Sequence, residues 1–341
     1  MKFDFKKLLV GAVIIVVLAV FFLRGDQLVQ LSETVQQGSM IPLVAAVFTQ
    51  LCKYVAQSFG YVFSFAAVGE KMMPRATLPL VFGTFFMNTV APSLNLAGMT
   101  LVVDDARRRG IDPGKSSSAA LLMQITIDGA FVTLMIVGFA ITVLFAGMSP
   151  LWFIPGIVVI GLVAAMIAIM VLGNKNPALL LHVARAIERF VNRVLGLFKR
   201  GPLDPWAERI IDMFSDAAGL ILENPKPAFK AYGTSLVASL CELACFSLVG
   251  VSFGVEDPVL LLCGYVIATL FAMVSFTPQG VGFVEAAVVV AFTAFGQTAA
   301  AGTAIGLVYR GIVFWIPFLI GAVLITRTKT FSRGDDKGET A

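Results

Sequence analysis

Four ionisable side chains lie inside long apolar stretches, where charge is rare: Lys53, Asp128, Glu242 and Arg310. On insertion scales, a charge at the centre of a bilayer costs about 2.5 to 3.5 kcal/mol, so each of the four requires an ionic partner or water. Two cations and two anions sum to zero, which permits pairs such as Lys53 with Asp128 or Glu242 with Arg310. The sequence does not choose between pairings. These charges either hold tilted helices together or form a site for a charged headgroup.

Other polar side chains share a helical face with three of these charges. Spacings of three, four or seven residues put the following groups on common faces: Gln50, Lys53 and Gln57; Gln124 and Asp128; Ser235, Ser239 and Glu242. Such polar stripes indicate a hydrated lumen, in which a headgroup could pass while its acyl chains remain in lipid.

Two apolar runs, 77–103 and 259–296, contain helix breakers near their middle. The breakers are Asn88, Pro92, Asn95 and Gly98 in the first run, and Pro278, Gly280 and Gly282 in the second. Unwound backbone at membrane depth persists only where protein or a wet cavity satisfies it. We therefore expect each run to be a re-entrant hairpin whose turn lines a cavity, the alternative being an ordinary kinked span.

The second turn has features of an anion site. Gly280 and Gly282 precede an apolar run, so the turn is expected to open a half-helix whose free N–H groups attract phosphate. Glu285 either caps this helix or competes with an anionic ligand, or gates it. The candidate substrate-binding residues are thus Lys53, Asn88, Asn95, Asp128, Glu242, Pro278, Gln279, Gly280, Gly282, Glu285 and Arg310.

Composition places the chain in a membrane. Hydrophobic residues make up 58% and charged residues 13% of the 341 residues, and the mean hydropathy is +0.90. The net charge of +4 indicates contact with an anionic membrane surface, and no nucleic-acid partner is expected. The four cysteines lack CxxC spacing, so neither a disulfide framework nor a metal site is expected. We expect no cofactor.

The distribution of Lys and Arg predicts the topology. Basic residues cluster at the N-terminus, around 71–75 and 107–115, through 175–230 and after 326, and by the positive-inside rule these segments are cytoplasmic. The fold expected is an all-α integral membrane domain with about six transmembrane helices and two re-entrant hairpins, in the cell membrane, with both termini cytoplasmic. Its expected parts are a first span (8–23), a first repeat (41–147), a connecting span (151–173), cytoplasmic amphipathic helices (175–227), a second repeat (228–326) and a disordered tail (327–341).

The two halves show the same order of features. Each half has a charge, a proline-containing break and a second charge at similar spacing: Lys53, Pro92 and Asp128, then Glu242, Pro278 and Arg310. Because the first half starts outside and the second inside, an inverted-topology repeat is predicted. Between them, 177–223 is amphipathic and basic, which favours a position at the headgroup level or, alternatively, a packed cytoplasmic hairpin.

The chain resembles the membrane domain of lysylphosphatidylglycerol synthases and their stand-alone integral membrane relatives, over nearly all of 8–326. The resemblance is carried by Asn88 through Gly98 to Arg109 and Asp128, by the turn at Pro278, Gly280, Gly282 and Glu285, and by Val308, Tyr309, Arg310, Trp315, Pro317 and Gly321. The family's usual glycine-rich first turn is here Pro92, Ser93, Leu94, Asn95, Leu96, Ala97, Gly98. The resemblance implies a flippase-like fold of inverted repeats with re-entrant helices, and lipid translocation. The chain ends soon after Thr326, so synthase activity is not expected.

Translocation of a phospholipid or polyprenyl lipid between leaflets is accordingly the expected function. There are two alternatives: a secondary transporter of a small anionic solute, and an accessory membrane subunit of a lipid or glycan synthesis enzyme. An enzyme is disfavoured because no histidine lies within an apolar stretch and no GxSxG or paired-aspartate motif is present. The sequence leaves homo-oligomerisation open.

Overall fold

The computed structural model describes residues 34–90, 95–146, 153–197, 225–274 and 280–327, with isolated positions between 208 and 223. Within these ranges every regular element is a helix. The first half contains α2 (Met40–Ala67), α3 (Pro74–Val90), α4 (Leu96–Arg108) and α5 (Pro113–Ala146). The middle contains α6 (Phe153–Lys175) and α7 (Pro177–Leu197). The second half contains α9 (Pro225–Ser252), α10 (Pro258–Val274), α11 (Phe283–Ala294), α12 (Ala299–Arg310), a π-helical turn η3 (Gly311–Trp315) and α13 (Ile316–Arg327).

Four helical segments of the described chain are long and apolar enough to cross a membrane: Met40–Ala67, Pro113–Ile141, Pro225–Ser252 and Ala299–Leu324. The two segments of 28 residues each extend about 42 Å at 1.5 Å per residue, more than the hydrocarbon core of about 30 Å. The protein is therefore a multi-pass membrane protein. The first predicted span, 8–23, and the tail after Arg327 lie outside the described residues.

Each apolar run with breakers forms two short helices. In the first run, α3 has 17 residues and α4 has 13, and in the second, α10 has 17 and α11 has 12. These helices are about 18 to 26 Å long, too short to cross the hydrocarbon core alone. The predicted interruption of both runs is confirmed, and both halves have the order long, short, short, long. In both halves the two short helices contact each other.

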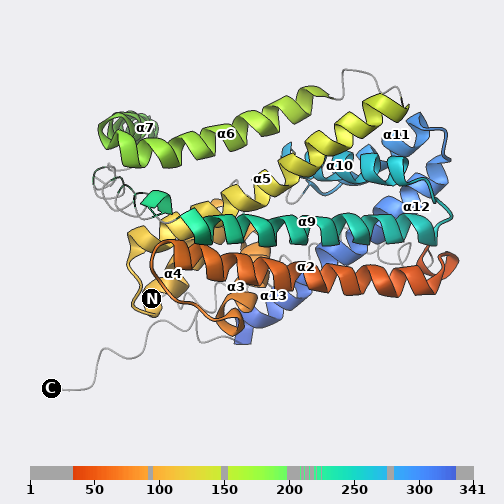
Figure 1. Cartoon of the computed structure of the whole chain (residues 1–341), viewed down its shortest axis with the longest axis horizontal. Helices are drawn as coiled ribbons and strands as arrows, with labels where there is room; N and C mark the ends of the chain where they lie inside the picture. The colour runs from red at the N-terminus through yellow and green to blue at the C-terminus, as the bar shows by residue number, and fades with distance from the viewer. Residues whose placement is uncertain are drawn as a thin grey trace.

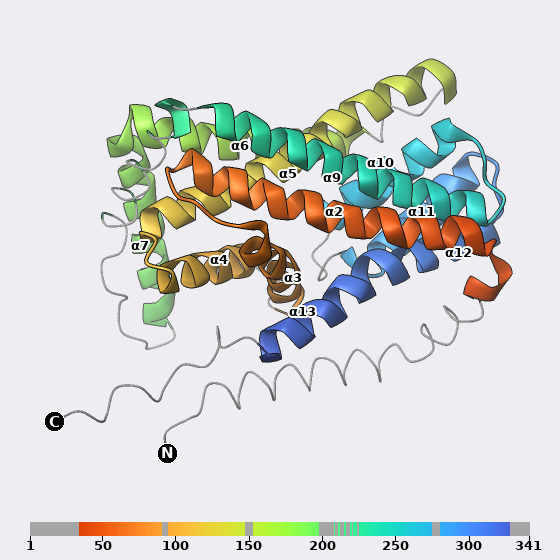
Figure 2. The same ribbon diagram turned by 60° about the horizontal axis from the view of Figure 1, so that its bottom comes forward.

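The long helices α2 and α9 form the centre of the bundle. They lie side by side and run in opposite directions in both views (Figures 1 and 2). At one end, the Ser39 N–H donates to the Ser252 carbonyl (3.0 Å), and the Ser252 hydroxyl donates to the Ser39 carbonyl (3.0 Å). The start of α2 is thereby attached to the end of α9, which fixes the antiparallel register of the pair.

The two halves also exchange contacts through small residues. In α13, a Cβ at Gly321 would lie 2.5 Å from the carbonyl oxygen of Phe82 in α3. In α5, a Cβ at Gly138 would lie 2.8 Å from a methyl group of Val266 in α10. The second helix of each half therefore packs on the last long helix of the other half, and glycine makes both approaches possible.

Helices α6 and α7 lie at one side of this bundle (Figures 1 and 2). Helix α7 extends across the end of α6, and its Leu180, Leu181 and Ala184 pack with Ile211. The first helix predicted for the amphipathic segment is thus present as α7. The second helix predicted for this segment falls largely outside the described residues.

Candidate functional site

Lys53 and Glu242 form an ion pair between α2 and α9. The Lys53 ammonium donates to Glu242 Oε1, and the two side chains are only 15% and 17% exposed. Lys53 Nζ also lies 5.7 Å from the centre of the Tyr54 ring, within cation–π range. The pairing that the sequence left open is therefore Lys53 with Glu242. It is neither Lys53 with Asp128 nor Glu242 with Arg310, because the antiparallel register brings positions 53 and 242 to the same level.

Buried phenol groups surround this ion pair. Tyr54, Tyr265 and Tyr309 are 3%, 1% and 4% exposed, and the carboxylate of Glu242 interacts electrostatically with all three. Tyr54 accepts a hydrogen bond from the Gln50 amide at 2.8 Å. These tyrosines are not among the site residues predicted from the sequence. Their signal was available, since they are three of only five tyrosines, and two directly follow or precede a membrane charge.

Arg310 and Glu285 form a second charged pair. Arg310 Nε lies 3.7 Å from Glu285 Oε1, and the two side chains are 9% and 24% exposed. The guanidinium lies over the ring of Phe314, 5.1 Å from its centre. Phe314 belongs to η3, and π-helical turns inside α-helices are frequent at functional sites.

Glu285 also caps α11. Its Oε2 accepts the Gly282 N–H at 2.7 Å, while Gly282 itself has a φ of 89°. The capping role considered from the sequence is therefore present in the structure. Gly280 also has a positive φ of 70°, and a Cβ there would lie 2.7 Å from the Ala272 backbone. Two more predicted site residues, Pro278 and Gln279, lie outside the described residues.

Asp128 lies on α5 and is bound by a neighbour on its own helix. The Gln124 amide donates to both carboxylate oxygens, at 3.0 and 2.9 Å. Two residues before Asp128, Thr126 accepts a hydrogen bond from the Ser235 hydroxyl of α9 at 3.0 Å, which attaches α5 to α9. Ser235 of the predicted polar stripe of α9 thus contacts α5 through Thr126. Thr126 lies off the predicted face of Gln124 and Asp128, and Asp128 accepts its hydrogen bonds from Gln124.

Asn88 connects the end of α3 to the start of α4. The Asn88 side-chain oxygen accepts the Gly98 N–H at 2.6 Å, and a Cβ at Gly98 would lie 2.8 Å from the same amide group. Asn95 has a left-handed backbone (φ 68°) directly before α4 and makes no side-chain cap. These two predicted site residues thus shape the turn between α3 and α4, with the Asn88 oxygen occupied by backbone.

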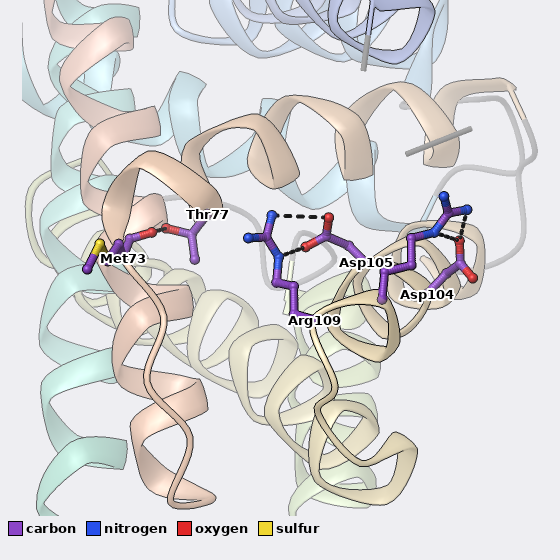
Figure 3. A network of polar contacts seen from close by, with 6 residues as sticks. Met73, Thr77, Asp104, Asp105 and Arg109 are labelled. Atoms are coloured by element: carbon purple, nitrogen blue, oxygen red, sulfur yellow. Dashed lines mark hydrogen bonds and ion pairs between the residues drawn. The ribbon is translucent and has the colours of Figure 1, made fainter. Parts of the chain in front are cut away.

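A group of salt bridges lies at the end of α4, beside α3 (Figure 3). Asp105 pairs with Arg109 (2.7 Å) and Asp104 with Arg108 (2.8 Å), each within one helical turn. Nearby, Lys115 pairs with Glu70 (2.7 Å). Two of the three arginines in the basic cluster therefore have acidic partners on the same helix.

No group of three or more metal-ligating side chains occurs among the described residues. The cysteines at 52, 241, 245 and 263 are free thiols. The described site thus consists of two ion pairs, Lys53–Glu242 and Glu285–Arg310, each between two helices of the bundle.

Comparison with known families agrees with this architecture. The sequence profile described as "Lysylphosphatidylglycerol synthase TM region" matches residues 8–321. A comparison with curated proteins gave no match. Since the match covers both interrupted apolar runs, three of the four membrane-length segments and nearly all of the fourth, the chain belongs to the lysylphosphatidylglycerol synthase transmembrane family.

Proposed function

We propose that this protein moves a phospholipid or polyprenyl lipid between the leaflets of the cell membrane. The observation that carries the proposal is the largely buried Lys53–Glu242 ion pair, with side chains 15% and 17% exposed, at the contact of two antiparallel central helices. Removing one partner of a buried pair leaves an uncompensated charge, whereas exchanging a partner for a charged headgroup does not. No catalytic step is part of the proposal.

The repeated order of helices supports an inverted repeat with two re-entrant hairpins. Antiparallel α2 and α9 would be equivalent helices of the two halves, as would α3 and α10, and α4 and α11. The reciprocal packing of α3 on α13 and of α10 on α5 is what a two-fold axis in the membrane plane predicts. Alternating access would then involve movement of one half against the other.

Polar side chains provide a route for a headgroup along the central helices. The Lys53–Glu242 pair, the three buried tyrosines and the Gln124–Asp128 pair lie on α2, α9, α5 and their neighbours. Acyl chains would remain outside in lipid, along the exposed apolar face of α2 that includes Ile41, Val44 and Phe48. This division matches the two chemical parts of a lipid.

The membrane surface is the proposed contact of α7. Leu179 and Val183 are each 48% exposed, and Arg185, Arg189 and Arg193 on the same helix are also exposed. A helix with exposed aliphatic and basic side chains is typical of the headgroup region of an anionic leaflet. With the basic loops, this supports a cytoplasmic position for the α7 end of the bundle and for both termini.

Reconstitution into liposomes tests the proposed function. Vesicles containing the full chain should move fluorescent phospholipid or polyprenyl phosphate across the bilayer faster than empty vesicles. Vesicles with Glu242→Gln protein, matched for protein content, should lose most of this movement. No movement above empty vesicles would refute lipid translocation, and gradient-dependent uptake of a small anion would favour a secondary transporter.

A further inference from the structure

Two cysteines flank the central ion pair, one on each helix. Cys52 directly precedes Lys53 in α2, and Cys241 directly precedes Glu242 in α9. The thiol of Cys241 interacts electrostatically with Cys52 and with the Lys53 ammonium. Both cysteines are reduced in the structure, and both are partly exposed. One thiol from each half therefore lies at the contact between the halves.

The register of α2 against α9 places the two thiols at the same level. A Cβ at Gly60 of α2 would lie 3.3 Å from Thr234 Oγ1 of α9, so these two positions are in contact. Cys52 lies eight residues before Gly60, and Cys241 lies seven residues after Thr234. Because the helices are antiparallel, the two cysteines differ in height by only one residue, or about 1.5 Å.

Small residues continue the contact from the Gly60 level to the cysteines. Ala56 lies halfway between Gly60 and Cys52 on α2, and Ala238 lies between Thr234 and Cys241 on α9. Spacings of three and four residues keep each set on one side of its helix. A disulfide needs Cα atoms about 4.4 to 6.8 Å apart, and small residues let membrane helices approach closely enough for that.

The same pattern precedes the charge in both helices: an exposed leucine followed by a cysteine. Leu51 is 41% exposed and Leu240 is 50% exposed, so the thiols adjoin the lipid-facing surface of the bundle. Under the proposed inverted repeat, Cys52 and Cys241 are equivalent positions, and a two-fold axis through the α2–α9 contact brings equivalent positions together. A small uncharged oxidant dissolved in the membrane can reach this side of the contact.

We propose that Cys52 and Cys241 are a redox-sensitive thiol pair, which hydrogen peroxide converts into a disulfide that joins the two halves. One thiol attacks the peroxide, so that its sulfur becomes a sulfenic acid while the O–O bond breaks and water leaves. The second thiol then attacks the sulfenic sulfur, forms the S–S bond and releases a second water. Both sulfurs are oxidised and one peroxide is reduced, so the reaction needs no other reactant.

The disulfide holds α2 against α9 at the level of the ion pair. It prevents the two halves from separating there, while the Lys53–Glu242 pair itself stays intact. This effect on movement rests on the proposed function, whereas formation of the disulfide does not.

Thiol counting tests the pair without any assumption about transport. The full chain in membranes is treated with hydrogen peroxide, denatured and labelled with a maleimide, and the labels are counted by mass spectrometry. The chain has four thiols, so we expect four labels before oxidation and two fewer after it, with a cross-linked peptide that contains Cys52 and Cys241. A reductant should restore all the labels.

Cys245 provides the matched control, because it lies one turn further along α9 and its thiol interacts with the same Lys53–Glu242 pair. Cys245→Ala should still lose two labels on oxidation, whereas Cys52→Ala should lose none. An unchanged label count in the oxidised wild-type chain overturns the proposal. A cross-link from Cys52 to Cys245, or between two copies of the chain, in place of the expected peptide also overturns it.

Lipid movement in vesicles separates this inference from the proposed function. Oxidised wild-type protein should lose most of its lipid movement and regain it after reduction, whereas Cys52→Ala protein should be insensitive to peroxide. Unchanged movement in fully cross-linked protein overturns the effect on the halves. Formation of the disulfide in a protein that moves no lipid even when reduced refutes the proposed function alone.

Discussion

The ammonium of Lys53 and the carboxylate of Glu242 meet across the α2–α9 contact, although 189 residues separate them in sequence. They come from the first helix of each half, so the contact between the halves contains one charge from each. Opening this contact would separate the two charges. Under the proposed function, the ion pair would couple movement of the halves to the arrival of a charged group.

Breaking this pair from one side should be costly. Lys53→Met or Glu242→Gln alone should destabilise the protein by about 3 kcal/mol, because the remaining group is left buried without its partner. The double variant should lose less stability than the sum of the two single losses, and the difference, the coupling free energy, should be about 1 to 3 kcal/mol. Thermal unfolding of detergent-purified protein measures this. Strictly additive losses would show that the pair does not contribute.

The close approach of α13 to α3 should not tolerate a side chain. Gly321→Val should destabilise the protein by about 1 to 3 kcal/mol, because the new Cβ would lie 2.5 Å from the Phe82 carbonyl oxygen. Gly161→Ala in α6 is the control, since a Cβ there meets no described atom within 4 Å. Unfolding midpoints of the two variants should differ clearly, and equal midpoints would contradict the packing of α13 on α3.

The first broken hairpin should depend on Asn88. Asn88→Ala removes the acceptor of the Gly98 N–H and should cost about 1 kcal/mol or more. Thr100→Ala, at an exposed position of α4, should change stability by less than about 0.5 kcal/mol. Thermal unfolding midpoints of the two variants test this prediction. An unchanged midpoint in Asn88→Ala would show that the hydrogen bond to the Gly98 N–H does not contribute to stability.

The antiparallel register of α2 and α9 can be tested by cross-linking. In a background without native cysteines, Ser39→Cys with Ser252→Cys should form a disulfide under mild oxidation, because the two residues exchange hydrogen bonds. Ser39→Cys with Lys226→Cys, at the other end of α9, should not. Mass spectrometry of proteolytic fragments identifies the link. Cross-linking of the second pair in place of the first would refute the register.

The orientation predicted from the basic residues can be tested by thiol labelling. In the same background, Arg107→Cys at the exposed end of α4 should react with an impermeant reagent only in inside-out vesicles. Glu256→Cys, at an exposed position in the turn between α9 and α10, should react in intact cells. This turn lies at the opposite end of the bundle from α4 (Figure 1). Gly110 is less suitable for labelling because its φ is 83°. Labelling of position 107 from outside would remove the proposed orientation and the re-entrant hairpins with it.

Much of the architecture was predictable because it depends on local chemistry. Apolar length predicts membrane helices, and the breakers around Pro92 and Pro278 predict that two of the apolar runs cannot be continuous. Both runs are indeed two short helices. The candidate charges were also recognisable one at a time, since an ionised side chain in an apolar stretch is conspicuous without any knowledge of its neighbours.

Which groups meet was not predictable, because that depends on helix register between residues far apart in sequence. The sequence permitted Lys53 to pair with Asp128, but the packing of α2 on α9 joins Lys53 to Glu242 and leaves Asp128 with Gln124. Tyr54, Tyr265 and Tyr309 can be singled out in the sequence as rare tyrosines in apolar stretches, but only the packing of three helices shows that they share one carboxylate. Hydropathy and helix breakers act within a segment, whereas ion pairing in a membrane protein is a property of the contact between segments.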